Sequence, residues 1–267
     1  MVYKASLFFA IAAFSSQEKA SSFFSFEFNL YKIGMMTEDD KKSFKYLKKS
    51  ADLEYSDAIL EIAYRYEIGK GVLSNVNKSI EYLHKVEHIP EALYHLGRLA
   101  YNNNEPTAYE YLKKAYEMNK HIKAGYYLAL CYEAGLGCLC DIHKSLKIYD
   151  ELLTLVEILS DRAWIIHSKA YCYKKLGNIE TAIKLFEDSA SMGEELSYQA
   201  LGNIFFDNDR KRALKYYLKI KEKSDEINQK IQVCKNIHQF PRFTQHNLSY
   251  LPADLGKLRM HQHFLAV

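Results

Sequence analysis

The chain has 267 residues, of which 48% are hydrophobic and 26% are charged, so it can bury a core and is not a disordered protein. Its 36 Lys and Arg residues are interspersed with 33 Asp and Glu residues, and this balance argues against a nucleic-acid partner. No apolar run reaches about 18 residues, which argues against a membrane span in the mature chain.

The first predicted element is a short apolar segment near the N-terminus. Lys4 precedes the apolar run 5–14, and small or polar residues follow at 15–17. This order is typical of an export signal and predicts a signal peptide within residues 1–20. The alternative is a hydrophobic capping helix, because Phe23, Phe24 and Phe26 continue the apolar character. We expect a periplasmic or secreted protein in the first case and a cytoplasmic one in the second.

Residues 21–221 contain a repeat. Shifting the sequence by 66 residues against itself aligns nine identical or similar positions without a gap, which indicates two units of about 33 residues. The aligned residues are Ala58, Ile62, Ala63, Tyr66, Glu67, Gly69, Gly71, Lys78 and Ser79, and they match Ala124, Leu128, Ala129, Tyr132, Glu133, Gly135, Gly137, Lys144 and Ser145.

Each unit is expected to form two helices that cross at small residues. The predicted first helices carry such a residue at Ala63, Gly97, Ala129, Ala170 and Gly202, and the second helices carry one at Ser43, Ser79, Ala108, Ser145, Ala182 and Ala213. A small residue lets two helix backbones approach, and the large neighbouring side chains fill the grooves beside it. One such pair cannot bury its apolar face alone, so the pairs must stack into a solenoid.

The first and third units have a longer loop between their two helices. Gly69 and Gly135 are placed to end the first helix in a left-handed conformation. Val72 and Cys138, which occupy equivalent positions, are expected to tuck under the loop.

These residues resemble a known family. The stretches 58–79 and 124–145 resemble Sel-1-like repeats, with alanine in place of the first glycine and serine in place of the later alanine. The shorter units, such as Ala170, Tyr173, Gly177, Ala182 and Phe186, resemble tetratricopeptide repeats. The resemblance implies an all-α fold, a right-handed α–α superhelix of about five to six helix pairs. It also implies a non-enzymatic scaffold or adaptor that binds a protein or peptide partner and needs no cofactor.

The last part of the chain departs from the repeat. Ile227, Ile231 and Cys234 keep helical spacing, which predicts a capping helix within 222–240 over the end of the stack. After Pro241 the pattern is lost, and we expect an irregular tail over 241–267.

The resemblance also suggests where a partner binds. In tetratricopeptide units, the residues three before and one after the small position of the first helix face the concave groove. Here they are Leu60, Tyr64, Tyr94, Arg98, Tyr126, Leu130, His167, Tyr171, Gln199 and Asn203. Tyrosine and arginine are the residues that most often anchor interfaces. The alternative is that many of these tyrosines pack between neighbouring units.

Two groups of residues leave other functions open. His84, Glu87 and His88 match the H-x-x-E-H motif of a zinc-dependent hydrolase, although Pro90 follows closely and no third ligand is evident. The second group is Cys131, Cys138, Cys140 and His143, which could bind zinc or consist of buried thiols. A cytosolic regulatory or immunity-type binder is a further alternative to an exported adaptor. Nucleotide-binding loops and serine-hydrolase motifs are absent from the sequence.

Overall fold

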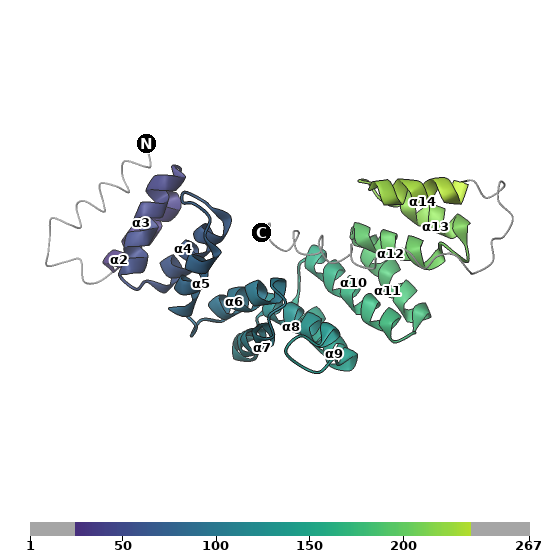
Figure 1. Cartoon of the computed structure of the whole chain (residues 1–267), viewed down its shortest axis with the longest axis horizontal. Helices are drawn as coiled ribbons and strands as arrows, with labels where there is room; N and C mark the ends of the chain where they lie inside the picture. Colours follow the sequence, from purple (N-terminus) through teal and green to yellow (C-terminus); the bar gives the residue numbers. More distant parts are fainter. Residues whose placement is uncertain (1–24, 236–267) are drawn as a thin grey trace. The chain divides into compact units, whose positions relative to one another are not determined.

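The computed structural model describes residues 25–235, which form helices without any strand (Figure 1). Six consecutive pairs and one further helix confirm the predicted all-α solenoid of helix pairs. The helices are α2 (Phe26–Met36), α3 (Asp40–Asp52), α4 (Ser56–Ile68), α5 (Val76–His84), α6 (Pro90–Asn102), α7 (Thr107–Asn119), α8 (Ile122–Ala134), α9 (Ile142–Leu155), α10 (Leu159–Lys175), α11 (Ile179–Ser191), α12 (Glu195–Phe205), α13 (Arg210–Lys219) and α14 (Asp225–Lys235).

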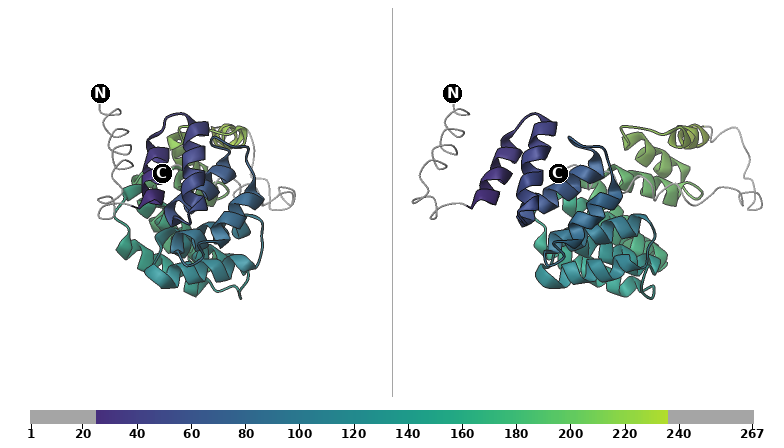
Figure 2. Two further views of the ribbon diagram at one scale, coloured as in Figure 1. Left: turned by 90° about the vertical axis from the view of Figure 1, so that its left-hand side faces the viewer. Right: turned by 60° about the vertical axis from the view of Figure 1, so that its left-hand side comes forward.

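The chain divides into two compact units, Met1–Glu194 and Glu195–Val267. The described part of the first unit holds the pairs α2–α3, α4–α5, α6–α7, α8–α9 and α10–α11. Figure 2 shows α2 and α3 side by side as the first of these pairs. The second unit holds the pair α12–α13 and helix α14.

Small residues bring the two helices of each pair together, as the sequence predicts. A Cβ atom added at Gly97 would lie 2.5 Å from Cγ of Leu112, and one added at Gly202 would lie 2.3 Å from the Tyr217 ring. Ala63, Ala129 and Ala170 occupy the same position in other pairs and are buried. The first pair uses Gly34, which the sequence analysis missed, with Leu47 2.6 Å from its added Cβ. Side chains larger than these would force the paired helices apart.

The two long loops share one construction. Gly69 and Gly135 end α4 and α8 with φ of 78° and 70°, which confirms the predicted left-handed cap. Two residues later, Gly71 and Gly137 also have positive φ. A Cβ at Gly71 would lie 2.1 Å from the backbone oxygen of Asp40, at the start of the preceding second helix. The long loop therefore packs directly on the backbone of the pair before it.

Most second helices begin with an N-cap that the sequence encodes. A short carboxylate or amide side chain accepts a hydrogen bond from the backbone N–H three residues later, which satisfies a donor that the helix leaves free. These capping residues are Asp39, Asn75, Asp141, Asn178 and Asp209.

In the second unit, α14 lies inside the range 222–240 where we expect a capping helix. It buries Ile227, Ile231 and Cys234, and its main neighbour is α13. The predicted signal segment 1–20 and irregular tail 241–267 lie outside the described residues. Within 25–235, no helix has both the length and the apolar character that crossing a membrane requires.

Candidate partner-binding surface

The first helices carry all ten residues predicted for the groove, and the structure separates these residues by burial. Five are buried, namely Tyr94, Arg98, Tyr126, Leu130 and His167. Leu60, Tyr171 and Gln199 are half-buried, whereas Tyr64 and Asn203 are exposed. The buried five can support a binding surface from beneath, and the accessible five are those that a partner could touch.

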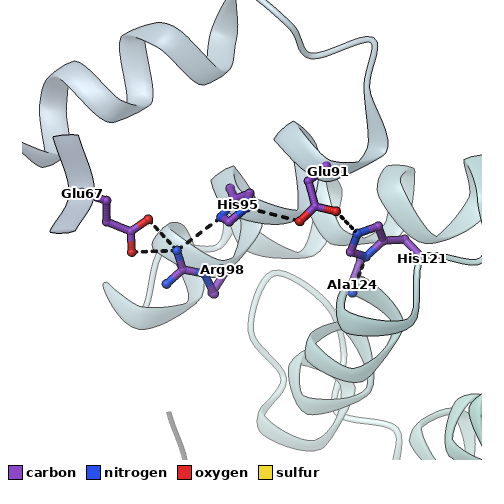
Figure 3. Close-up of polar contacts among 6 residues, drawn as sticks. All are labelled: Glu67, Glu91, His95, Arg98, His121 and Ala124. Carbon is purple, nitrogen blue, oxygen red and sulfur yellow. Dashed lines mark hydrogen bonds and ion pairs between the residues drawn. The ribbon is translucent and has the colours of Figure 1, made fainter. Parts of the chain in front are cut away.

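Arg98 is buried because it pairs with a residue of the preceding repeat. Its Nη2 donates hydrogen bonds of 2.7 Å to both carboxylate oxygens of Glu67, at the end of α4 (Figure 3). Burial alone would lower the pKa of Arg98, but the hydrogen bond and charge of Glu67 outweigh this and raise it. This ion pair joins α4 to α6.

A chain of polar contacts continues from Arg98 along α6 to the start of α8 (Figure 3). Nδ1 of His95 accepts a hydrogen bond of 3.4 Å from Arg98, and Nε2 of His95 lies 3.3 Å from Glu91. Glu91 also lies 2.7 Å from Nε2 of His121. Nδ1 of His121 accepts the backbone N–H of Ala124 at 3.1 Å and so caps α8.

This geometry fixes the position of the proton on both imidazoles. Arginine and the backbone amide can only donate, so Nδ1 of His95 and of His121 must be unprotonated, and each ring carries its proton on Nε2. Both Nε2–H groups then donate to Glu91. The hydrogen bonds from His121 and His95 hold the pKa of Glu91 well below its usual range.

The buried tyrosines are held by side chains of the next repeat. The Tyr94 ring stacks on His121 with ring centroids 5.0 Å apart, and Tyr127 lies 6.1 Å away. Tyr126 shares a 3.0 Å hydrogen bond with Ser168 of α10. Burial raises the pKa of both tyrosines. These two side chains therefore pack between units, the alternative that the sequence analysis left open.

His167 lies in an aromatic cluster in the pair α10–α11. Its ring centroid is 5.1 Å from that of Tyr171 and 5.4 Å from that of Phe186, and Trp164 lies 6.0 Å away. Burial lowers the pKa of His167 to about 3. The imidazole is therefore neutral at physiological pH.

The accessible residues of the predicted groove are distributed over both units. Tyr64 and Leu60 lie one turn apart on α4, and Tyr171 lies on α10. In the second unit, Asn203 accepts hydrogen bonds from the Tyr217 hydroxyl at 2.8 Å and from Lys230 at 2.9 Å. Asn203 therefore helps to hold α12, α13 and α14 together.

The candidate metal ligands are exposed or dispersed. His84 is the last residue of α5 and its Nδ1 lies 2.5 Å from Glu87, whereas His88 is exposed beyond the helix end. No three or more His, Cys, Asp or Glu side chains in the described part of the chain group as metal ligands would. Cys131, Cys172 and Cys234 are buried free thiols, whereas Cys140 is exposed. Burial raises the pKa of Cys131 and of Cys172 to about 12, so neither thiol is a nucleophile at neutral pH.

Sequence reasoning missed the acidic partners in these networks. It aligned Glu67 with Glu133 at the 66-residue offset but assigned neither a role. In the structure, Glu133 accepts hydrogen bonds from the Tyr149 hydroxyl at 2.7 Å and from Lys175 of α10 at 3.0 Å. Both glutamates therefore link their repeat to the next pair, and their recurrence at one repeat position was the available signal.

Comparison with solved structures shows the fold. A Sel1 repeat protein from Oxalobacter formigenes aligns over 88% of this chain and 96% of its own, with 20% identity and a TM-score of 0.55. The protective antigen c5321 of uropathogenic Escherichia coli, described as having an SLR fold, aligns over 73% of this chain and 45% of its own, with 21% identity and a TM-score of 0.61. A chain of the APC/C Cut9–Hcn1 hetero-tetramer aligns over 78% of this chain and 42% of its own, with 14% identity and a TM-score of 0.61.

No curated protein matches the chain in sequence. The family model of the Sel1 repeat, in contrast, matches residues 29–55, 56–85, 90–120, 122–151 and 202–225, which together make up more than half of the chain. The pair α10–α11, where the sequence resembles tetratricopeptide repeats, falls between the last two matched segments. With these matches and the stacked helix pairs, the chain belongs to the Sel1 repeat family.

Proposed function

We propose that the chain is a non-enzymatic scaffold that binds a partner polypeptide through the first-helix surface, defined here as Leu60, Tyr64 and Tyr171 of the first unit. Sel1 repeat folds commonly serve as protein-interaction scaffolds. In the second unit, Gln199 and Asn203 are the corresponding accessible residues.

The observation that carries this proposal is the exposure of Tyr64. Among residues 25–235, it is the only tyrosine that is exposed rather than buried or half-buried, with 39% of its surface accessible. Neither a ring contact nor a hydrogen bond occupies its side chain in that part of the chain. An accessible tyrosine offers a partner a large apolar area together with a polar tip, at little cost in conformational entropy.

The neighbouring side chains support Tyr64 as a preformed anchor. Glu61 and Arg65 form an ion pair of 2.7 Å along α4, and the buried Arg65 side chain is thereby held in place. Three residues beyond Tyr64, Glu67 is tied to Arg98 of the next pair. A surface whose support is already ordered loses less entropy when a partner binds.

The test is a quantitative affinity capture that compares three full-length proteins. The variant Tyr64→Ser removes the anchor without touching the buried core, against which Leu60 packs. The control, Leu73→Ser/Leu139→Ser, removes two leucines from the long loops, which are 89% and 90% exposed. We expect a polypeptide that the wild type and the control retain equally and the α4 variant loses, with unchanged circular dichroism. Equal retention by all three proteins would contradict the proposal.

A further inference from the structure

Helix α13 carries an unusual concentration of positive charge. Its ten residues include Arg210, Lys211, Arg212, Lys215 and Lys219 and no acidic residue. None of these five side chains forms an ion pair with the described residues, although Lys221 and Lys230 nearby are paired with Glu195 and Glu226. By contrast, α7 and α9 in the first unit each balance two lysines with two acidic residues. Helix α3 also has an excess of lysines, five against two aspartates, but α13 is the one described helix that contains no acidic residue.

Lys211 and Lys215 lie on the face of α13 opposite its buried side chains. Ala213, Tyr216 and Tyr217 are buried on the opposite face. The exposed residues Lys211, Lys215 and Leu218 are spaced by four and three positions, which aligns them along one side of a helix. Leu218, with 52% of its surface exposed, thus lies in the same row as two ammonium groups that form no ion pair within 25–235.

Two further cations flank this row and are held by aromatic rings of α12. The guanidinium of Arg212 lies 3.8 Å from the centroid of Phe205, which stacks in turn on Tyr216. The ammonium of Lys219 lies 4.9 Å from the centroid of Tyr198. A guanidinium stacked on a ring keeps its N–H edge available for a carboxylate, and its position is fixed before binding.

We propose that this basic face of α13, formed by Lys211, Arg212, Lys215, Leu218 and Lys219, binds an acidic polypeptide segment that places an apolar side chain against Leu218. The positive charge, which no carboxylate of the described residues pairs with, favours a ligand that carries carboxylates, and the exposed leucine within the row favours an apolar contact. A nucleic-acid backbone supplies the charge but no side chain for Leu218. A single leucine is too little apolar area for stable membrane attachment. This surface lies in the second unit and does not depend on the first-helix surface.

The experiment measures binding of labelled peptides to the full chain by fluorescence anisotropy. The first probe is a 12-residue glutamate-rich peptide with two central leucines, and the second has serines in place of these leucines. The test variant is Lys211→Glu/Lys215→Glu. Its control, Lys114→Glu/Lys147→Glu, makes the same change in net charge at exposed positions of α7 and α9. A Leu218→Ser variant tests the apolar contact separately.

The expected result is salt-sensitive binding of the leucine peptide that the α13 variant weakens roughly tenfold, while the control remains within about twofold of the wild type. Leu218→Ser should weaken the leucine peptide and leave the serine peptide unchanged. Absence of peptide binding, or an equal loss in the control, would overturn the proposal. Tighter binding of a single-stranded oligonucleotide or of phosphatidylserine vesicles than of the peptide would also overturn it. Because Tyr64 is unchanged in all these proteins, failure here leaves the first-helix proposal standing.

Discussion

Glu67 and Arg98 illustrate how single side chains join consecutive repeats. The side chains are 16% and 3% exposed, so each depends on the other for neutralisation. Among residues 25–235 the Nε of Arg98 has no hydrogen-bond partner, which makes the contacts of its Nη2 with Glu67 the main compensation for burying the guanidinium. A buried pair of this kind adds little net stability, but losing one partner is costly.

We therefore predict that Glu67→Gln lowers the free energy of unfolding by about 3 kcal/mol, because it leaves the buried Arg98 charge without a counterion. Urea unfolding followed by circular dichroism measures this change. The control is Glu180→Gln, which breaks an ion pair with Lys184 whose side chains are 82% and 70% exposed. Because both side chains of that pair are solvated, this change should leave the free energy of unfolding unchanged within the error of the measurement. Equal effects of the two variants would show that the Glu67–Arg98 pair does not hold the repeats together.

His167 gives the protein a specific sensitivity to acid. Burial lowers its pKa from the ordinary 6.5 to about 3, so the unfolded chain binds a proton below pH 6.5 that the folded chain does not bind until about pH 3. Stability must then fall as the pH decreases through this window, by about 1.4 kcal/mol for each pH unit.

The variant His167→Leu removes that titration while it keeps the site apolar. We expect a shallower loss of stability between pH 6.5 and pH 4 than in the wild type, measured by urea unfolding at a series of pH values. The difference between the two proteins isolates His167, because every other titrating group is common to both. Parallel curves would mean that the imidazole is not buried in its neutral form.

Among the elements, the long loops of the first and third units have the strictest requirements. Positive φ alone favours glycine, because other residues lose about 1–2 kcal/mol in that conformation. Gly71 and Gly137 meet a second requirement, since an added Cβ would lie 2.1 Å from the backbone oxygens of Asp40 and Pro106. The two requirements explain why glycine occupies this loop position in both long units, at Gly71 and, 66 residues later, at Gly137.

Two alanine substitutions separate these requirements. Gly177→Ala tests positive φ alone, because φ is 77° and nothing lies within 4 Å of an added Cβ. It should lower the free energy of unfolding by about 1 kcal/mol. Gly71→Ala has a similar φ of 74° but collides with the backbone of Asp40, and should cost about 3 kcal/mol or more. Thermal or urea unfolding measures the loss of stability in both variants. An equal loss in the two would contradict the claim that the long loop packs on the backbone of the preceding pair.

At the scale of the whole molecule, the repeat architecture could be predicted from sequence because it rests on local requirements. Ala63, Gly97 and Gly202 lie where helices cross, and Gly69 lies where a helix must end. Small residues at helix crossings and glycine at helix ends recur along the chain, so comparing the sequence with itself reveals them. Gly34 escaped notice because the surrounding first repeat differs more from the others.

The binding surface was harder to predict, because burial depends on contacts between pairs rather than on spacing within one. Family spacing places Tyr94 and Tyr126 on the face of the first helices. It does not show that Tyr94 packs against His121, the N-cap residue of α8, and against Tyr127 of α8, or that Ser168 of α10 forms a hydrogen bond with Tyr126. Residues 27 to 42 positions apart meet in these contacts, and no local pattern pairs Glu67 with Arg98 or Tyr126 with Ser168. The exposure of Tyr64 emerges only once those contacts are known.

The central claim is that the chain acts by binding a partner polypeptide at the first-helix surface, and site-specific photo-crosslinking tests it most directly. A p-benzoylphenylalanine residue introduced at position 64 replaces one aromatic side chain by another, and the same residue at position 73 places the probe on an exposed loop. Both proteins are irradiated in cells and the crosslinked products are identified by mass spectrometry. We predict one polypeptide partner crosslinked from position 64 and not from position 73. Crosslinking of that partner from position 73 alone, or no crosslink from position 64, would contradict the account.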